Sequence, residues 1–137
     1  MDLFQWDDSF KLNIAKIDDQ HEQLISLICE LEGAVQDGTG GQLITYVLQE
    51  LIRYVGVHFA DEEQLMMQHK FPDLAEHRRM HDFYVTKLKE IQEQYQEGDA
   101  LSNATLEFLK EWIATHIKGT DQIYGRFIRA ETDPQAN

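Results

Sequence analysis

Residues 58–81, HFADEEQLMMQHKFPDLAEHRRMH, contain histidines and a glutamate that recur at a spacing of four. Residues four apart lie on one face of an α-helix, because the helix repeats about every 3.6 residues. His58 is therefore expected to project beside Glu62, and His77 beside His81. Neutral imidazole binds iron, zinc, copper or nickel, and a carboxylate can bridge two metals. The stretch indicates two helices that present metal-binding side chains.

Three further residues of the same kinds lie on other segments that are predicted to be helical. The full set of candidate metal ligands is His21, His58, Glu62, His77, His81, His116 and Asp121. Seven such groups are too many for one four-coordinate zinc, and they suit two metals that share carboxylates. The sixth histidine, His69, lies at the end of its helical segment, and we expect it to be structural or solvent-facing.

The segment 42–69 is predicted to be a helix with an unusual inward face. Its inward positions step alternately by four and three residues, as one face of a helix on a core does. These positions are Ile44, Leu48, Leu51, Val55, His58, Glu62, Leu65 and His69. His58 and Glu62 thus take positions that the pattern reserves for apolar side chains. An unpaired carboxylate in a core is costly, so Glu62 needs a partner there.

Two more helices are expected on either side of this one. The first spans about 18–36, opens on aspartates that suit a helix N-terminus, and ends at the glycines of 38–41. The next spans about 74–96, and Asp73 with Glu76 resembles a capping box at its start. Its inward positions include both histidines of the His-x3-His pair.

The fourth helix is expected to carry the last two ligand candidates. Asp99 or Ser102 is suited to cap its start. His116 and Asp121 are five residues apart, which is about 140° around a regular helix. A straight helix would not aim both side chains at one point. We therefore expect the helix to end or distort around Gly119.

The two ends of the chain are expected to lie outside these helices. Residues 1–17 are predicted to form an extended N-terminal arm, residues 122–130 a short terminal segment, and residues 131–137 a frayed tail. The aromatic residues expected to pack these ends on the core are Trp6, Phe10, Tyr124 and Phe127. Four helices joined by short turns predict an all-α, up-down-up-down four-helix bundle in one domain over residues 1–137.

Composition limits the classes of function. At 137 residues, with 42% hydrophobic residues and two prolines, the chain fits one helix-rich domain. A formal net charge of −13 argues against a nucleic acid or an anionic membrane as partner. Cys29 is the only cysteine, so no internal disulfide can form. The sequence shows neither a signal peptide nor the roughly 20 apolar residues of a membrane span, and we expect a cytoplasmic protein.

The order of the ligand candidates resembles the hemerythrins, and the bacterial single-domain members in particular. A histidine is followed by His-x3-Glu, His-x3-His and His-x4-Asp, from Trp6 to about Phe127, with no departure at a ligand position. Spacing alone leaves open a zinc site at the His-x3-His pair. A ferritin-like di-iron oxidase is disfavoured because the chain has no Glu-x-x-His pair. By resemblance, the centre is a non-haem di-iron site.

The resemblance also implies which ligands each iron takes. One iron takes three histidines, namely His77, His81 and His116. The other takes two histidines, His21 and His58, which leaves it one open position for dioxygen. Both irons are bridged by two carboxylates, Glu62 and Asp121, together with an oxo or hydroxo group.

An apolar wall around the open position is implied by the same resemblance. The residues that match it are Leu24, Phe59, Trp112, Ile113 and Ile117. The same five residues also fit ordinary core packing, and the two roles are compatible. In the family the bound oxygen is held as a hydroperoxide, and a dry wall keeps water and protons from displacing it.

Reversible binding of dioxygen, for storage or for delivery to an oxygen-consuming enzyme, is therefore the expected function. A di-iron enzyme such as a peroxidase, an oxidase or a nitric-oxide-handling protein is disfavoured, because no general acid or base is evident beside the open position. An oxygen or redox sensor would need an output domain, for which 137 residues leave no room, or a separate partner. We expect no enzymatic activity, and a monomer, since nothing in the sequence marks a large exposed apolar face.

Overall fold

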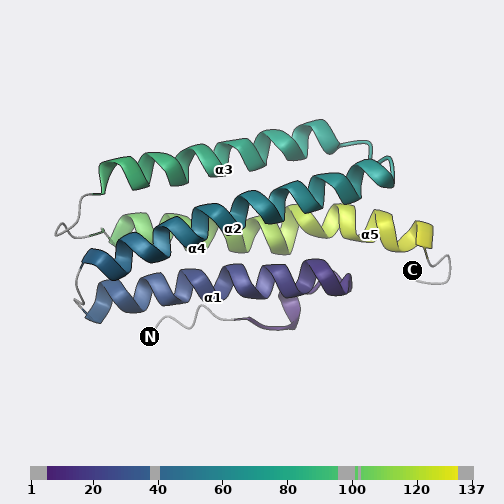
Figure 1. Cartoon of the computed structure of the whole chain (residues 1–137). Helices are drawn as coiled ribbons and strands as arrows, with labels where there is room; N and C mark the ends of the chain where they lie inside the picture. The colour runs from purple at the N-terminus through teal and green to yellow at the C-terminus, as the bar shows by residue number, and fades with distance from the viewer. Residues whose placement is uncertain (1–5, 38–40, 96–100, 102, 133–137) are drawn as a thin grey trace.

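The computed structural model describes residues 6–37, 41–95, 101 and 103–132, which form a bundle of four helical rods (Figure 1). Three rods are single helices, namely α1 (Ala15–Asp37), α2 (Gly41–Gln68) and α3 (Leu74–Gln94). The fourth rod is α4 (Asn103–Thr115), a π-helical turn η2 (His116–Thr120) and α5 (Asp121–Thr132) in direct succession. Successive rods run in opposite directions, so the predicted up-down-up-down bundle is confirmed.

The rods are not packed equally tightly against one another. α2 packs along both α1 and α3, and α1 also contacts α4. Among the described residues, α3 and α4 make few close backbone approaches, so this pair encloses the loosest side of the bundle. In Figure 1, α2 crosses in front of the α4–α5 rod, with α3 above it and α1 below.

The inward face of α2 follows the predicted pattern for most of its length. Its four apolar positions from Ile44 to Val55 are buried, and so are His58 and Glu62. Beyond Glu62 the pattern shifts by one residue, because Met66 is buried while Leu65 is only half-buried. A strict seven-residue repeat drifts by about 20° per repeat on a regular helix, so the inward position moves along the chain.

The N-terminal arm is shorter and less extended than predicted. α1 begins at Ala15, and the arm contains a 3-10 turn, η1 (Asp8–Phe10). Asp18 does not cap a helix that starts beside it. Instead its carboxylate accepts hydrogen bonds from the backbone N–H groups of Leu12, at 2.7 Å, and Asn13, at 3.0 Å. The turn before α1 is made by Asn13, whose φ of 63° lies in the left-handed region, so the helix starts earlier.

The aromatic residues of the arm pack as expected. The rings of Trp6 and Phe10 stack with centroids 5.5 Å apart, and Phe10 is buried. The side chain of Gln122 donates to the Lys11 carbonyl at 3.0 Å, and the Arg129 side chain donates to the Leu12 carbonyl. The arm is thereby fixed to α5 at one end of the bundle.

The capping box predicted at the start of α3 is wrong. Asp73 occupies the N-cap position, but its side chain makes no capping hydrogen bond. Its backbone, with φ −100° and ψ 23°, is not extended, so the carboxylate is not presented to the first-turn N–H groups as in a normal cap. The turn is instead closed by backbone hydrogen bonds, including Phe71 N–H to the Met66 carbonyl at 2.9 Å.

The C-terminal segment is a full helix rather than a short terminal piece. α5 continues to Thr132, so the predicted tail at 131–137 begins inside the helix, and 133–137 lie outside the described residues. Tyr124 is buried and Phe127 half-buried on the bundle, as predicted. The proposed caps Asp99 and Ser102 also lie outside the described residues.

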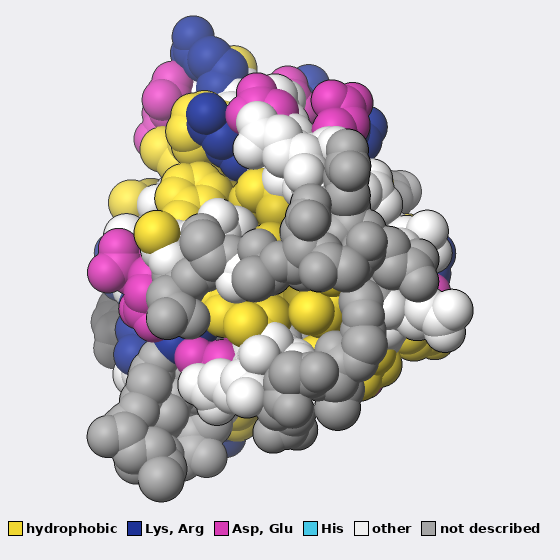
Figure 2. Space-filling model, turned by 90° about the vertical axis from the view of Figure 1, so that its left-hand side faces the viewer, with side chains coloured by type: hydrophobic (Ala, Val, Ile, Leu, Met, Phe, Trp, Pro, Cys, Tyr) yellow, Lys and Arg dark blue, Asp and Glu magenta, His cyan; other side chains and the backbone are white. Residues whose placement is uncertain are grey.

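The end of the bundle where α1 leads to α2 and α3 leads to α4 shows an apolar interior. In Figure 2, hydrophobic side chains fill the middle of this end, and charged side chains lie around its upper rim. Over the residues that the structure describes, no helix has both the length and the apolar character needed to cross a membrane.

Candidate metal centre

All seven candidate ligands are buried and converge inside the bundle. None of them is more than 4% exposed. They come from α1, α2, α3, η2 and the first residue of α5. Their ligand atoms form two groups, Glu62, His77, His81, His116 and Asp121 on one side, and His21, His58 and Glu62 on the other. The structure thus brings together every residue of the predicted set.

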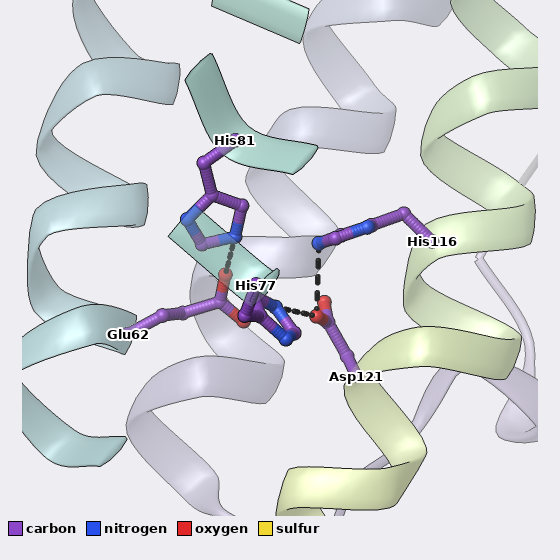
Figure 3. A group of neighbouring side chains, drawn as sticks. All are labelled: Glu62, His77, His81, His116 and Asp121. Atoms are coloured by element: carbon purple, nitrogen blue, oxygen red, sulfur yellow. Dashed lines mark ion pairs between the residues drawn. The ribbon is translucent and has the colours of Figure 1, made fainter. Parts of the chain in front are cut away.

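Asp121 lies between histidines of both groups. Its Oδ1 atom is 2.9 Å from Nε2 of His77 and 3.0 Å from Nε2 of His116 (Figure 3). Its Oδ2 atom is 3.1 Å from Nε2 of His21. The two oxygens of one carboxylate therefore face the two groups.

Glu62 occupies the matching position on the opposite helix. Its Oε1 atom is 3.3 Å from Nε2 of His58 and 3.3 Å from Nε2 of His81. Its Oε2 atom is 3.2 Å from Nε2 of His21. Figure 3 shows the Glu62 and Asp121 side chains reaching toward the histidines from different helices. Each carboxylate therefore lies within 3.3 Å of histidines of both groups.

The π-helical turn is what brings Asp121 to the site. The backbone N–H of Asp121 donates to the carbonyl of His116, which lies five residues earlier in the chain. In an α-helix the acceptor lies four residues earlier. This wider turn offsets the 140° that would separate the two side chains on a regular helix. The predicted distortion between His116 and Asp121 is confirmed, and the chain continues as a helix beyond it.

Many polar atoms of the site are buried without a hydrogen-bond partner. They are Nδ1 of His21, Nε2 of His77, His81 and His116, Oε1 of Glu62, and both carboxylate oxygens of Asp121. Several of these atoms lie within 3.3 Å of one another without hydrogen-bond alignment. In a core that holds only protein, such atoms are nearly always paired. Imidazole nitrogens and carboxylate oxygens that share one buried space fit metal ions as their missing partners.

The local electrostatics keep both carboxylates negative. Burial favours a raised pKa for Glu62, but His58 and the hydrogen bonds from histidines outweigh it and hold the pKa well below its usual value. Burial and the negative charge of Glu62 favour a raised pKa for Asp121. His116 outweighs both, so the pKa of Asp121 is also lowered. Burial lowers the pKa of His21, but Asp121 and Glu62 raise it to about 9. The site therefore attracts positive charge strongly.

Two residues that sequence reasoning missed, Gln20 and Glu63, hold ligand histidines in place. Nδ1 of His58 lies 2.7 Å from the side-chain oxygen of Gln20, and Nδ1 of His81 lies 2.8 Å from a carboxylate oxygen of Glu63. These contacts leave the Nε2 atoms facing inward, and such outer hydrogen bonds fix the orientation of ligating imidazoles. Gln20 and Glu63 each neighbour a ligand candidate in sequence, which was the available signal.

Tyr124 supports Glu62 directly. Its hydroxyl donates a hydrogen bond to Oε2 of Glu62. Burial and the charge of Glu62 raise the pKa of Tyr124 well above its usual value, so the hydroxyl stays protonated. It follows Asp121 by one helical turn, and the sequence indicated only that it packs on the bundle.

The five predicted pocket residues belong to the core or pack against it, and each lies within one helical turn of a ligand candidate in sequence. Leu24, Phe59, Ile113 and Ile117 are buried, and Trp112 is half-buried. The aromatic pair contacts the ligand candidates. Phe59 stacks on His81 with centroids 3.7 Å apart, and Trp112 stacks on His116 at 4.5 Å. Both rings therefore lie on the side of the larger group of ligands.

A surface groove reaches the site from the loose side of the bundle. It has a volume of about 600 Å³ and is lined by residues of α3 and of the rod that faces it, including Met80, Phe83, Phe108, Trp112 and His116. A neighbouring groove of about 290 Å³ includes His77. The candidate ligands nearest the surface are therefore on α3 and η2.

His69 lies apart from the cluster, as predicted. Its ring is half-buried, and Nδ1 is 3.1 Å from a carboxylate oxygen of Glu131. It belongs to neither ligand group.

Comparison with known proteins agrees with this geometry. The family model described as the hemerythrin HHE cation binding domain matches residues 12–128. The chain belongs to the hemerythrin family. It is 32% identical over 130 residues to a bacteriohemerythrin of Stenotrophomonas maltophilia, covering 95% of this chain and 84% of that protein. It is 32% identical over 121 residues to the myohemerythrin of Riftia pachyptila, covering 88% and 90% respectively.

Solved hemerythrin structures share the fold. A wild-type hemerythrin crystal structure superimposes with a TM-score of 0.83 at 28% sequence identity, covering 93% of this chain and 98% of that one. A bacteriohemerythrin of Methylococcus capsulatus is 31% identical over 132 residues, which is 95% of this chain and all of that protein. The helical bundle and its buried cluster of histidines and carboxylates are therefore of the hemerythrin type.

Proposed function

We propose that this hemerythrin-family protein binds dioxygen reversibly at a di-iron centre, for storage or for delivery to an oxygen-requiring enzyme. The observation that carries the proposal is the pair of ligand groups joined by Glu62. Asp121 reaches the same two groups through its two oxygens. Two buried carboxylates shared between histidine groups suit two metal ions better than one.

In this proposal each iron takes the ligands that the family pattern assigns. Three histidines hold one iron, namely His77, His81 and His116. Two histidines hold the other, namely His21 and His58. Glu62 and Asp121 would be shared by the two irons, since each carboxylate lies near histidines of both groups. Two ferrous ions held by these residues would supply the two electrons that reversible oxygen binding needs.

The protein's own contribution is orientation and the exclusion of water. Gln20 and Glu63 hold the outer nitrogens of two ligand imidazoles, and the Tyr124 hydroxyl fixes Glu62. Leu24, Ile113 and Ile117 are almost completely buried, each within one helical turn of a ligand in sequence, and keep the interior apolar. Rigid ligands in a dry surrounding favour the release of unchanged dioxygen over irreversible oxidation.

Two measurements on the purified protein test this function. Metal analysis is expected to give two irons per chain after expression with ample iron. The reduced protein is then exposed to oxygen, and the gas is removed. A reversible carrier returns to the diferrous state, whereas an oxidase is left diferric.

A matched pair of histidine variants shows whether the predicted ligand positions matter. His77→Gln removes a buried ligand candidate and is expected to lower the iron content. His69→Gln removes a histidine that lies in the turn between α2 and α3 and contacts Glu131, and it is expected to keep both irons. One tightly held zinc and no iron in the wild type would contradict the proposal.

A further inference from the structure

The outward face of α2 carries a second regular pattern, opposite the ligand-bearing face. Its positions step alternately by three and four residues, and they are Leu43, Tyr46, Glu50, Arg53, Val57, Ala60, Gln64 and Met67. All are exposed except Glu50, which is half-buried. We call these eight residues the outer stripe.

Large hydrophobic side chains are concentrated on this stripe. Six are exposed in the described part of the chain, and four of them lie here, namely Leu43, Tyr46, Val57 and Met67, at 41%, 58%, 48% and 55% exposure. Leu43 and Tyr46 lie one turn apart, and Val57 and Met67 follow on the same side of α2 after about 16 and 15 Å. Single exposed hydrophobic residues are ordinary, but here four of the six share one face of one helix. In Figure 1, α2 lies at the front of the bundle, and no other helix covers its outward side.

The spacing of the stripe is that of a helix that packs on another helix. Alternating steps of three and four residues produce one continuous strip that faces a partner helix. Gly56 and Ala60 flank Val57 on this side, and an added methyl group at Gly56 would meet nothing within 4 Å. The α2 backbone can therefore be approached closely there.

The charges in the middle of the stripe favour a second copy of α2 as the partner, in the antiparallel direction. Glu50 and Arg53 form an ion pair of 2.9 Å within the chain. If a second α2 ran parallel in register, Glu50 would face Glu50, and like charges would repel. If it ran antiparallel about an axis between these two residues, Glu50 of each copy would face Arg53 of the other. The apolar residues then match as well, Tyr46 with Val57 and Leu43 with Ala60.

We propose that residues 43–60 of the outer stripe of α2 are a docking surface for a second copy of this chain. The two copies form a two-fold symmetric dimer with antiparallel α2 helices, centred between Glu50 and Arg53. A surface that is complementary to itself is what a two-fold interface requires. The monomer expected from the sequence rested on the lack of an exposed apolar face, and α2 presents one.

Charge variants test both the surface and the geometry. The iron-loaded protein is studied by sedimentation equilibrium at physiological ionic strength, from micromolar to millimolar concentration. The wild type is expected to reach twice the single-chain mass of 16.0 kDa. Glu50→Arg alone and Arg53→Glu alone each place like charges opposite one another, and each is expected to weaken dimerisation by about tenfold or more.

The two single variants become complementary when mixed. Chains with Glu50→Arg then face chains with Arg53→Glu, so the mixture is expected to form a heterodimer although each variant alone does not. The double variant Glu50→Arg/Arg53→Glu is expected to restore the homodimer. The control is Glu90→Arg on α3, because Glu90 pairs with Lys87 at the same spacing on another exposed face. It is expected to leave the dimer unchanged.

A second matched pair of variants tests the apolar residues of the stripe. Val57→Asp is expected to give a monomer with full iron content, whereas Ile123→Asp, at a similarly exposed residue of α5, is expected to leave the dimer intact. A wild type that stays monomeric at millimolar concentration would overturn the proposal. A dimer that withstands both Val57→Asp and Glu50→Arg would overturn it too, since the contact would then lie elsewhere.

Discussion

The two halves of the bundle place different side chains on the same helical pattern. In the half where α1 leads to α2, which we call the apolar half, the inward positions are filled by buried aliphatic residues, including Leu31, Leu48, Leu51, Leu88 and Leu109. In the other half, which we call the ligand half, the same steps of three and four residues carry His58, Glu62, His77, His81 and His116. One pattern therefore serves two kinds of interior.

The difference shows what each half needs in order to stay folded. Aliphatic side chains are stabilised by leaving water, whatever else is bound. The one lysine buried in the described apolar half, Lys110, is matched by Glu32 at 2.7 Å and Glu107 at 3.0 Å. In the ligand half, Glu62 and Asp121 are fully buried, and Oε1 of Glu62 and both carboxylate oxygens of Asp121 lack hydrogen bonds. We therefore expect bound cations to stabilise that half and metal binding to be coupled to its folding.

The largest expected effect is a difference in iron content between a variant in the ligand half and a variant in the apolar half. Glu62→Ala removes the residue shared by both ligand groups, and we expect it to lose most of the bound iron. Leu51→Ala removes a buried side chain from the apolar half, and we expect it to keep both irons while lowering the free energy of unfolding by about 3 kcal/mol. Iron analysis and urea unfolding of the same preparations measure both effects. Full iron in Glu62→Ala would show that the halves do not differ in this way.

Removal of the metal is expected to loosen one half more than the other. Without cations the ligand half retains buried carboxylates whose oxygens lack partners, so local opening there becomes easier. Amide hydrogen exchange in α3 around His77 and in η2 is expected to speed up at least about tenfold relative to the region of Leu48, which corresponds to about 1.4 kcal/mol. The comparison is made between chelator-treated and iron-loaded protein. An equal acceleration in both regions would mean that the bundle responds as one unit.

Ile117→Ser tests the predicted apolar wall in the ligand half, next to His116 in sequence. Ile117 is completely buried. If Ile117 is only a core residue, the substitution should lower the free energy of unfolding by a few kcal/mol and leave the oxygen chemistry of the folded protein unchanged. As part of the oxygen site, the serine would admit water or a proton, and the oxygenated form would decay to the diferric state several times faster. Decay in air is followed well below the unfolding temperature. Equal decay rates in the wild type and the variant, with equal iron content, would show that Ile117 has only a packing role.

The smallest expected effect concerns the arm that closes the ligand half. Asp18→Ala removes two hydrogen bonds to the backbone of Leu12 and Asn13, and we expect it to lower the free energy of unfolding by about 1 kcal/mol. Asp19→Ala, at the exposed neighbouring position, is the control and is expected to change stability little. Equal losses in the two variants would show that the arm is not held by Asp18.

The inward positions could be predicted because they depend on local periodicity. Ile44 to Glu62 are spaced regularly along one helix, and the five-residue gap between His116 and Asp121 was enough to predict a distortion. Asp73 shows the limit of this reasoning. Its residue type suits a cap, but the backbone angles of the turn decide whether the side chain is used.

The supporting contacts could not be predicted, because they join residues far apart in the chain. Glu63 lies beside a ligand in sequence, yet its role depends on α3 bringing His81 within 2.8 Å. Lys110 has the charge of a surface residue, and only the position of α1 explains its burial against Glu32. The outer stripe was also present in the sequence, but its pattern gained meaning when those positions proved to be exposed.

The π-helical turn also matters for anyone who aligns or redesigns this rod. The inward residues before it are Leu109, Ile113 and His116, and those after it are Asp121, Tyr124 and Ile128. A pattern carried across His116 with ordinary helical steps would bring Thr120 and Phe127 inward and turn Asp121 and Ile128 toward water. The π-helical turn therefore shifts the inward-facing pattern by one residue. The inward positions of α5 have to be counted from Asp121 and not from α4.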